Sequence, residues 1–342
     1  MNQPHRPFLS LLELLPEPWE LIDTFQEACT ISGVSFQMAG LTARRIQDQV
    51  TVTGSACDCE SDPGNRAWFE LLERISLVTA RSLPPSTCWR LRPWSDTNAP
   101  RLATSQELFA GSPTPDLWTP AKSNGVAMGP TWTAAGQHAL FELIERHLVL
   151  ASWYGAIRPR PVMSEGPTHL LPLKKAWRVE HYDLGQFTCD GLTVHASGTF
   201  LWPQQAGPSV IYGFGAHSDP GAALEKSRNE ALQRLCFLHD ADEPDGSPIF
   251  RPTPDFHQDY FLQKEQQALL RRWLSGDHFE PRYAQALPMS GSAYGLDLTP
   301  HHSFPGRVVQ VFIAGCLPLI FGRFQPPEFP DLPADRLIHP IM

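Results

Sequence analysis

The chain spells nearly the same amphipathic segment twice, and this repeat limits what the chain can fold into. The first copy reads WFELLERISLVTA at 68–80, and the second reads LFELIERHLVLAS at 140–152. A weaker third copy, NEALQRLCF at 229–237, has Glu230 and Gln233 where the other copies have two glutamates. The uneven spacing excludes a solenoid, which needs a short fixed period. We therefore expect one local helical device that is used several times around a common centre.

The paired glutamates predict a cation site if the copies meet. Residues i and i+3 share one face of a helix, so Glu70 projects with Glu73, and Glu142 projects with Glu145. For one such pair alone, a solvent-exposed helix face is the simpler interpretation. Two pairs brought face to face would instead form an anionic, oxygen-rich site for a hard cation such as Mg²⁺. The adjacent Arg74 and Arg146 could donate to phosphates there.

The segment SNGVAMGPTW at 123–132 precedes the second copy and has two glycines and a polar start. It fits either a plain turn into a helix or a loop that brings backbone N–H groups to a phosphate. The glycine-rich fingerprints of P-loop and dinucleotide-binding proteins do not occur in the sequence. Any nucleotide site is therefore expected to be of another kind.

Composition excludes several classes of protein. The 342 residues carry a net charge of −9 with no basic block, which argues against binding nucleic acid through overall charge. The N-terminal residues lack the pattern of a secretory signal, and no apolar run is long enough to span a membrane. We expect a cytoplasmic protein with no membrane partner, whose seven cysteines are mostly buried thiols. The pair Cys57 and Cys59 lacks the second ligand pair that zinc sites usually have.

Hydrophobic periodicity predicts a mixed α/β or α+β chain that forms one domain over residues 1–342. Helices are expected at 17–32 (ended by Gly33), 66–80, 133–153, 220–238 and 258–274. Strands are expected at 49–53, 192–202 and 209–217, with a buried strand and turn at 307–323. The Pro- and Trp-rich residues 83–122 are expected to form a long loop, and the Pro-rich tail 324–342 is expected to lack regular structure.

Four segments together resemble one known family, the YcaO-like ATP-dependent enzymes. They are GSACDCESDPGNRAWFELLER at 54–74, SNGVAMGPTWTAAGQHALFELIER at 123–146, GFGAHSDPGAALEKSRNEALQR at 213–234 and RVVQVFIAGCLPLIFGR at 307–323. The tail, with His339 and Pro340 near its end, is similar to that of the azoline-forming branch. The resemblance covers nearly the whole chain. It implies an α+β fold with largely antiparallel sheets backed by helices around a central nucleotide site.

The resemblance also implies residue roles, with ATP and Mg²⁺ as cofactors. The Mg²⁺ ligands would be Glu70, Glu73, Glu142 and Glu145. Contacts to the nucleotide would come from Arg74, Arg146, Lys226, Ser123, Asn124 and Glu230. The tail would run back to the active site and place His339, Pro340 and Met342 there as catalytic residues, although a mobile terminus is an equal alternative.

The implied activity is phosphorylation of a peptide backbone amide oxygen after attack by a neighbouring Cys, Ser or Thr side chain. Loss of phosphate then leaves a thiazoline or oxazoline in a ribosomal precursor peptide, as in bacteriocin-type thiazole/oxazole-modified peptides. Two alternatives stay open. The first is the same ATP chemistry with another nucleophile, giving a thioamide or amidine. The second is a non-catalytic scaffold that binds a peptide or partner, because Pro130 and Ala134 stand where the family commonly has Asn and Glu.

The resemblance implies partners as well. The family core uses all residues of this chain, so we expect a separate E1-like partner protein that captures the leader of the precursor peptide. An FMN-dependent azoline dehydrogenase is a further candidate partner. A homodimer is expected because such assemblies are common.

Overall fold

The structure is a computed structural model that describes residues 17–342 apart from 96–97, 165, 205–208, 240–247 and 302–303, together with residues 12 and 15. Its strands form four sheets, and the strand pairs are antiparallel except where β12 joins β9. The expected α+β class, with largely antiparallel sheets backed by helices, is confirmed.

Neighbouring strands within each of the four sheets are hydrogen-bonded in the following orders. The first contains β1 (Trp19–Ile31), β2 (Val34–Arg45) and β3 (Thr51–Asp58). The second contains β11 (Ile211–His217), β10 (Leu192–Pro203), β9 (Trp177–Cys189) and β12 (Ser290–Gly291), with β8 (Arg160–Val162) also beside β9. The third contains β5 (Arg101–Thr104), β4 (Cys88–Pro93), β13 (Ala293–Asp297), β14 (Arg307–Ile313) and β7 (Val126–Gly129). The fourth contains β15 (Ile320–Gly322) and β6 (Trp118–Pro120).

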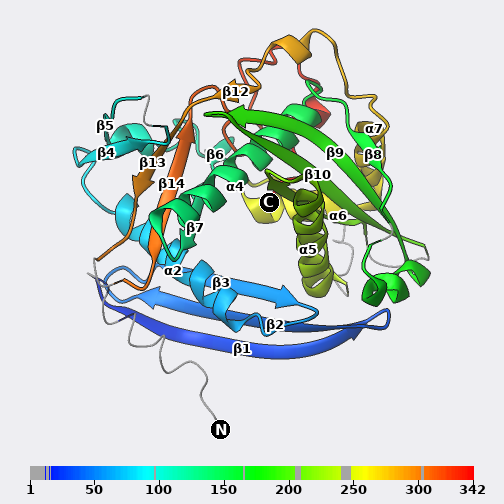
Figure 1. Ribbon diagram of the computed structural model, residues 1–342, viewed down its shortest axis with the longest axis horizontal. Coiled ribbons are helices and arrows are strands. Elements are labelled where there is room, and N and C mark those ends of the chain that lie inside the picture. The colour runs from blue at the N-terminus through cyan, green and yellow to red at the C-terminus, as the bar shows by residue number, and fades with distance from the viewer. Residues whose placement is uncertain are drawn as a thin grey trace.

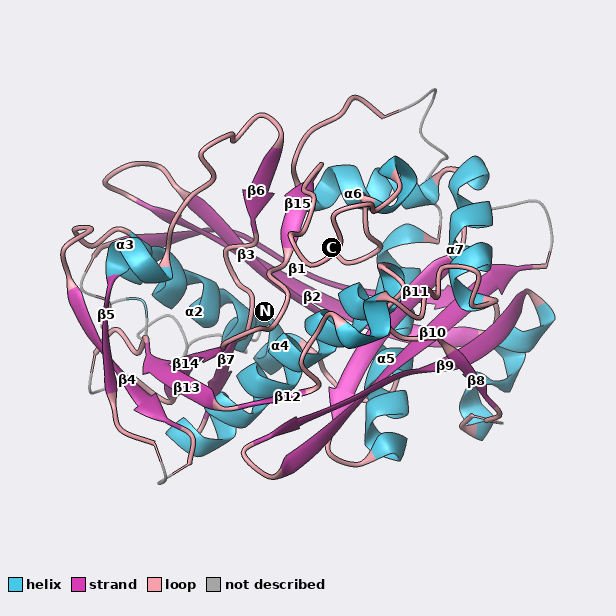
Figure 2. Ribbon diagram, turned by 90° about the horizontal axis from the view of Figure 1, so that it is seen from above, coloured by secondary structure: helices cyan, strands magenta, loops and turns pink. Residues whose placement is uncertain are grey.

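Three long helices carry the three copies of the repeat: α2 (Gly64–Arg81), α4 (Trp132–Trp153) and α5 (Pro220–Leu238). They pack on β3, on β7 and β14, and on β10 and β11, respectively. Shorter helices are α3 (Ser105–Leu108), α6 (Pro254–Leu262) and α7 (Gln267–Leu274). The C-terminus lies near the centre of the molecule, between α4 and α5 in Figure 1, and the perpendicular view in Figure 2 also places it centrally.

Close contact between helix and strand depends on strand glycines. A Cβ at Gly54 of β3 would lie 2.2 Å from the Ala67 carbonyl oxygen of α2, and a Cβ at Gly213 of β11 would lie 2.3 Å from the Ala231 nitrogen of α5. Such separations are far below van der Waals contact, so no larger residue fits without moving the helix. The glycines therefore let α2 and α5 lie close enough for their glutamates to reach the strand backbone.

The predicted helix at 17–32 is wrong, because these residues form β1. Strand β1 pairs with β2 in a register that runs from Trp19 opposite Arg45 to Ile31 opposite Val34. The connecting residues Ser32 and Gly33 have φ values of 50° and 82°. Two consecutive positive φ values are typical of the tight turn that joins hairpin strands, so Gly33 ends a strand rather than a helix.

Three other boundaries also differ from the sequence-based expectation. The predicted loop 83–122 contains the β4–β5 hairpin and β6. Single apolar residues of the hairpin, such as Leu91 and Ala103, are buried although the segment is rich in proline. Strand β9 was not predicted, because Arg178, Glu180 and a β-bulge near Gly185 interrupt its apolar alternation. The helix expected at 258–274 is two helices, since Gln263 takes an extended backbone conformation between α6 and α7.

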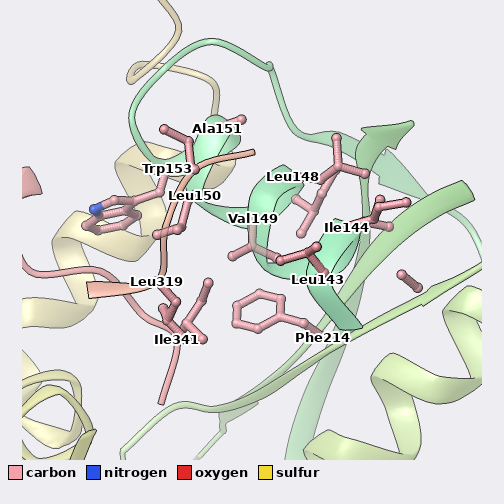
Figure 3. Packing of buried hydrophobic residues seen from close by; sticks show 14 of the residues in the cluster. Leu143, Ile144, Leu148, Val149, Leu150, Ala151, Trp153, Phe214, Leu319 and Ile341 are labelled. Carbon is pink, nitrogen blue, oxygen red and sulfur yellow. The ribbon is translucent and has the colours of Figure 1, made fainter. Parts of the chain in front are cut away.

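Helix α4 is the centre of the largest core cluster. Its residues Leu143, Ile144, Leu148 and Trp153 are among those packed with Phe214, Leu319 and Ile341 (Figure 3). Burial of this kind stabilises a fold by roughly 25 cal/mol per Å² of apolar surface, so α4 is held rigidly from several sides. None of the helices in the described ranges is both long and apolar enough to cross a membrane.

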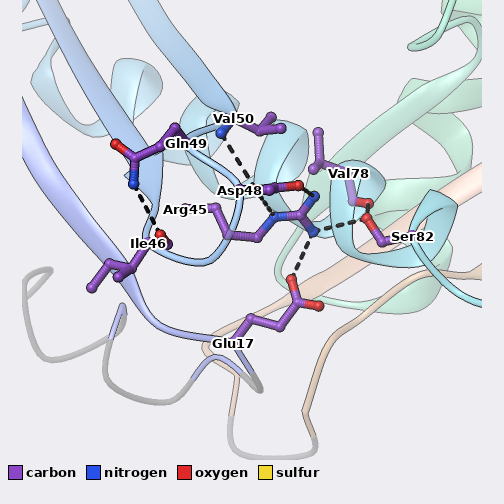
Figure 4. A network of polar contacts seen from close by, with 8 residues as sticks. All are labelled: Glu17, Arg45, Ile46, Asp48, Gln49, Val50, Val78 and Ser82. Atoms are coloured by element: carbon purple, nitrogen blue, oxygen red, sulfur yellow. Dashed lines mark hydrogen bonds and ion pairs between the residues drawn. The ribbon is translucent and has the colours of Figure 1, made fainter.

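A buried arginine fixes the end of α2 on the first sheet. The Arg45 guanidinium donates to Glu17 at 2.8 Å, to Asp48 at 2.9 and 2.7 Å, and to the Ser82 hydroxyl at 2.8 Å, just after α2 (Figure 4). The hydrogen bond from Arg45 to Asp48 raises the pKa of the guanidinium, so Arg45 stays protonated and positively charged. This network orients the helix that carries Glu70 and Glu73.

Candidate functional site

The three copies of the repeat make the same contact with the backbone. The first glutamate of each copy accepts a hydrogen bond from an N–H group 15 to 17 residues earlier in the chain: Glu70 from Ser55 at 2.8 Å, Glu142 from Gly125 at 3.2 Å, and Glu230 from Phe214 at 3.3 Å. The third copy, although weaker in sequence, is therefore the same structural device. Glu70 and Glu230 are fixed by a strand that adjoins their helix, and Glu142 is fixed by the turn just before β7.

An arginine four residues later neutralises part of each carboxylate. Arg74 lies 2.5 Å from Glu70, and Arg146 lies 2.6 Å from Glu142. In the third copy the charge of Arg234 lowers the pKa of Glu230, opposing the larger effect of burial. Arg234 was not singled out from the sequence. Its position in NEALQRLCF, equivalent to those of Arg74 and Arg146, was the available signal.

The second glutamates, Glu73 and Glu145, are held at a higher electrostatic cost. Burial raises the pKa of Glu73 well above its ordinary value, and the charges of Glu142 and Glu70 raise it further. Burial also raises the pKa of Glu145 well above its ordinary value, with the Glu230 charge as the next cause. The Glu73 carboxylate accepts a hydrogen bond from the Met128 N–H at 3.2 Å. The five glutamates thus act on one another, as expected if the copies surround a common centre.

A cavity of about 270 Å³ lies between α4, α5 and the end of the chain. Its walls are Glu142, Glu145 and Arg146 of α4, Phe214 of β11, Glu230 and Arg234 of α5, and residues 340–342. An Arg234 N–H points to the Met342 sulfur at 3.3 Å. The structure therefore brings Pro340 and Met342 to the same cavity as Glu142, Glu145 and Glu230, whereas Glu70 and Glu73 do not line it.

His339 is placed differently from its two neighbours in the tail. Its side chain is fully buried, and its Nε2–H donates to the Ile320 carbonyl at 2.9 Å. Its own carbonyl accepts a hydrogen bond from His257 Nδ1 at 2.9 Å. Burial lowers the pKa of His339 to about 4, so the ring is neutral near pH 7. His339 anchors the tail and does not form part of the cavity wall.

Ser123, Asn124 and Lys226 contact residues of α4 and do not line the cavity. Arg146 donates to the Ser123 carbonyl at 3.2 Å and to Asn124 Oδ1 at 3.4 Å. The Lys226 ammonium lies 5.1 Å from the Phe141 ring centroid. Burial lowers the pKa of Lys226, and the Glu145 charge partly opposes that shift.

Gln310 is a residue that the sequence analysis missed. Its Nε2 donates to the Asn124 carbonyl at 3.3 Å. Its buried Oε1, like the buried Nε of Arg234, has no hydrogen-bond partner among the described residues. A glutamine within the apolar run RVVQVFI was the available signal, since buried polar side chains in strands need a reason.

These features fit a ligand that supplies both cations and hydrogen-bonding groups. Buried carboxylates with raised pKa values gain from a bound cation, and the arginine donors suit phosphate oxygens. Among the described residues no three His, Cys, Asp or Glu side chains form a ready-made metal site, and this includes Cys57 and Cys59. Mg²⁺ does not require one, because it commonly uses one or two carboxylates together with substrate phosphates.

Comparison with protein families gives a match over more than half of the chain. Residues 81–316 match the model described as YcaO cyclodehydratase, ATP- and Mg²⁺-binding. A comparison with curated protein sequences gave no significant match.

Solved structures share the fold at low sequence identity. A YcaO protein from Methanopyrus kandleri bound with AMPPCP and Mg²⁺ is 20% identical with a TM-score of 0.56, over 86% of each chain. The E. coli microcin synthetase McbBCD complex with pro-MccB17 bound contains a chain that is 14% identical with a TM-score of 0.59, over 92% of this chain and 95% of that one. A heterocyclase in complex with substrate and cofactor is 16% identical with a TM-score of 0.56, over 87% of this chain and 50% of that one.

Proposed function

The chain belongs to the YcaO family, whose model is ATP- and Mg²⁺-binding, and on this premise we propose that it forms thiazoline or oxazoline rings in a ribosomal precursor peptide. One observation carries the proposal. Three helices each present a glutamate fixed by backbone N–H and an arginine one turn later, and α4 and α5 enclose a cavity together with the end of the chain. Heterocyclase and microcin synthetase structures with this fold support the peptide substrate class.

The proposed reaction joins a side chain to the carbonyl carbon that precedes it. The Cys thiol or the Ser or Thr hydroxyl attacks that carbon, and the amide oxygen then takes the γ-phosphoryl group of ATP. Departure of phosphate and loss of a proton leave the ring, so the peptide loses one water while ATP becomes ADP and phosphate. Bound Mg²⁺ would supply neutralisation of phosphate charge.

The residues of this chain would bind and orient the reactants. We propose Glu70, Glu73, Glu142 and Glu145 as the metal-binding carboxylates. We propose Arg74, Arg146, Lys226, Ser123, Asn124 and Glu230 as residues that hold the nucleotide. Arg234 and Gln310 join this set because each has a buried polar atom that needs a partner.

The tail would complete the site from the opposite side. Pro340 and Met342 line the cavity, so they would lie beside the reacting amide and exclude water from it. His339 would position them through its hydrogen bond to the Ile320 carbonyl. The proposed part of His339 is therefore positioning rather than proton transfer.

A non-catalytic scaffold is the alternative raised by Pro130 and Ala134. Pro130 is exposed after β7, and the Ala134 N–H is used by the Thr131 side chain to cap α4 at 3.2 Å. Neither residue belongs to the cavity wall. The carboxylate and arginine set is independent of both positions, which favours an active enzyme.

The proposed enzyme works in the cytoplasm with an E1-like partner that binds the peptide leader, and an FMN-dependent dehydrogenase would oxidise the rings to azoles. A thioamide or amidine product remains the alternative outcome for the same site. We also propose that residues 1–342 form a single domain and that two copies of the chain form a homodimer.

Mass spectrometry of a reconstituted reaction tests the function. The chain is incubated with ATP, Mg²⁺, a candidate precursor peptide and the partner, and phosphate release is measured in parallel. We expect the peptide to lose the mass of one water for each ATP hydrolysed. The mass change and the phosphate release should both be absent in Glu145→Gln and present in the exposed Glu265→Gln. Exchange of oxygen for sulfur would indicate thioamide formation. Nucleotide binding without turnover would support the scaffold.

A further inference from the structure

Three cysteine thiols meet where the first sheet packs against α5. Cys29 lies on β1, Cys57 on β3 and Cys236 on α5. The sulfur atoms of Cys29 and Cys236 are 3.5 Å apart, although these residues are 207 positions apart in the chain. Cys57 forms a hydrogen bond with Cys236 as well. The fold therefore assembles a thiol cluster that no sequence motif signals.

The distance between Cys29 and Cys236 is suited to a covalent bond. A disulfide has an S–S length of about 2.0 Å, so the two sulfur atoms need to approach by roughly 1.5 Å. The outer strand β1 can supply this movement, since it is the edge strand of its sheet. Cys236 is only 3% exposed and sits on a packed helix, so the movement falls to β1.

The cluster can be reached from solvent by a small oxidant. Cys29 is partly exposed, whereas Cys57 and Cys236 are buried. Cys57 and Cys59 also line a cavity of about 230 Å³ beside Arg66 and Arg228. The hydrogen bond with Cys57 and burial both raise the pKa of Cys236, so Cys29 is the thiol expected to react first.

We propose that Cys29 and Cys236 form a reversible intramolecular disulfide when the protein meets a peroxide. The Cys29 thiol reduces the peroxide O–O bond and becomes a sulfenic acid, with release of one water. The Cys236 thiol then attacks that sulfur, and a second water leaves as the S–S bond forms. Overall, two thiols and one hydrogen peroxide give one disulfide and two waters, and a dithiol reductant reverses the change.

The disulfide would tie β1 to α5 only two residues after Arg234. A cross-link between positions 207 residues apart restricts the unfolded chain strongly, so oxidation should stabilise the protein. We expect the melting temperature to rise by about 5 °C or more, and to return to its original value when dithiothreitol is added.

Peptide mapping tests this proposal on the full chain. The protein is treated with hydrogen peroxide, its remaining thiols are blocked with N-ethylmaleimide, and the digest is analysed by mass spectrometry with and without reductant. We expect loss of two of the seven thiols and a reducible peptide that joins Cys29 to Cys236. Cys29→Ser should lose both this peptide and the melting shift, whereas the exposed Cys88→Ser should keep both.

Cys29→Ser is the safer variant, because Cys236 lies in the core and its replacement could impair folding. A linkage of Cys57 to Cys236 in the wild-type protein would overturn the proposed pairing. Retention of all seven blocked thiols after peroxide treatment, or cross-linking between chains through Cys88, would overturn the intramolecular disulfide itself.

Discussion

Replacement of Glu73 by glutamine should stabilise the ligand-free protein while it destroys the proposed cation site. Glutamine keeps a carbonyl oxygen for the hydrogen bond from the Met128 N–H. It removes a buried negative charge that lies in the field of Glu142 and Glu70. An unpaired buried ion costs several kcal/mol, and Arg74 offsets part of that cost here. We therefore expect a gain of about 1–3 kcal/mol in the free energy of unfolding near pH 8.

The gain should depend on pH in a defined direction. The pKa of Glu73 is higher in the folded than in the unfolded state, so its ionisation removes stability as the pH rises above the ordinary value of 4.5. The free energy of unfolding of the wild type should therefore fall over this pH range, and that of Glu73→Gln should not fall for this reason. Below about pH 4.5 the carboxyl is protonated in both states, and the difference should vanish.

Thermal unfolding without nucleotide measures this difference. For a chain of 342 residues the expected gain corresponds to a rise of roughly 1–4 °C in melting temperature near pH 8. Mg²⁺ and ATP at about one hundred times the dissociation constant should stabilise the wild type by about 2.7 kcal/mol and leave the variant unchanged. The difference in melting temperature between the two proteins should then shrink or change sign. The exposed Glu265→Gln is the matched control. A ligand-free Glu73→Gln protein that melts below the wild type near pH 8 would refute the reasoning.

Three further changes test how the site is built. Arg45→Met removes a buried guanidinium from Glu17, Asp48 and Ser82, and urea unfolding should show a loss of about 2–4 kcal/mol. Gly213→Ala places a methyl group 2.3 Å from the Ala231 nitrogen and should cost about 2 kcal/mol or more in the same assay, whereas Gly111→Ala, with no atom within 4 Å, should cost little. Acid should loosen the tail, because the pKa of His339 is about 4 when folded and near 6.5 when unfolded. As the pH falls from about 6.5 to about 4, the free energy of unfolding should therefore drop by up to about 1.4 kcal/mol per pH unit for this histidine. In His339→Gln the melting temperature should depend less on pH over this range.

The repeat was the part of the site that sequence reasoning could reach. The helical spacing of Glu70, Glu73, Glu142 and Glu145 depends only on local geometry, so the helices that carry them were predicted within about two residues. The third copy is visible as well, but its Gln233 replaces the second glutamate, so the sequence alone does not show that Arg234 lies at the same cavity.

Other features depend on contacts between distant residues. The apolar spacing of 17–32 fits a helix nearly as well as a strand, and the choice is made by the turn at Ser32 and Gly33 and by pairing with β2. The neutral state of His339 follows from its burial, and its ring is placed by a contact with the carbonyl of Ile320, which lies 19 residues earlier. The contact of Cys29 with Cys236 has the same origin and left no pattern in the sequence.

Binding of ATP with Mg²⁺ by isothermal titration calorimetry tests the central claim most directly. The native chain is compared with Glu142→Gln, which keeps the size of the side chain but removes the charge that Arg146 contacts at 2.6 Å. We expect binding by the native chain that requires Mg²⁺, and a loss of affinity of about a hundredfold or more in the variant. Equal binding by both proteins, or no binding by the native chain alone or with its partner, would contradict a nucleotide site built from the paired glutamates.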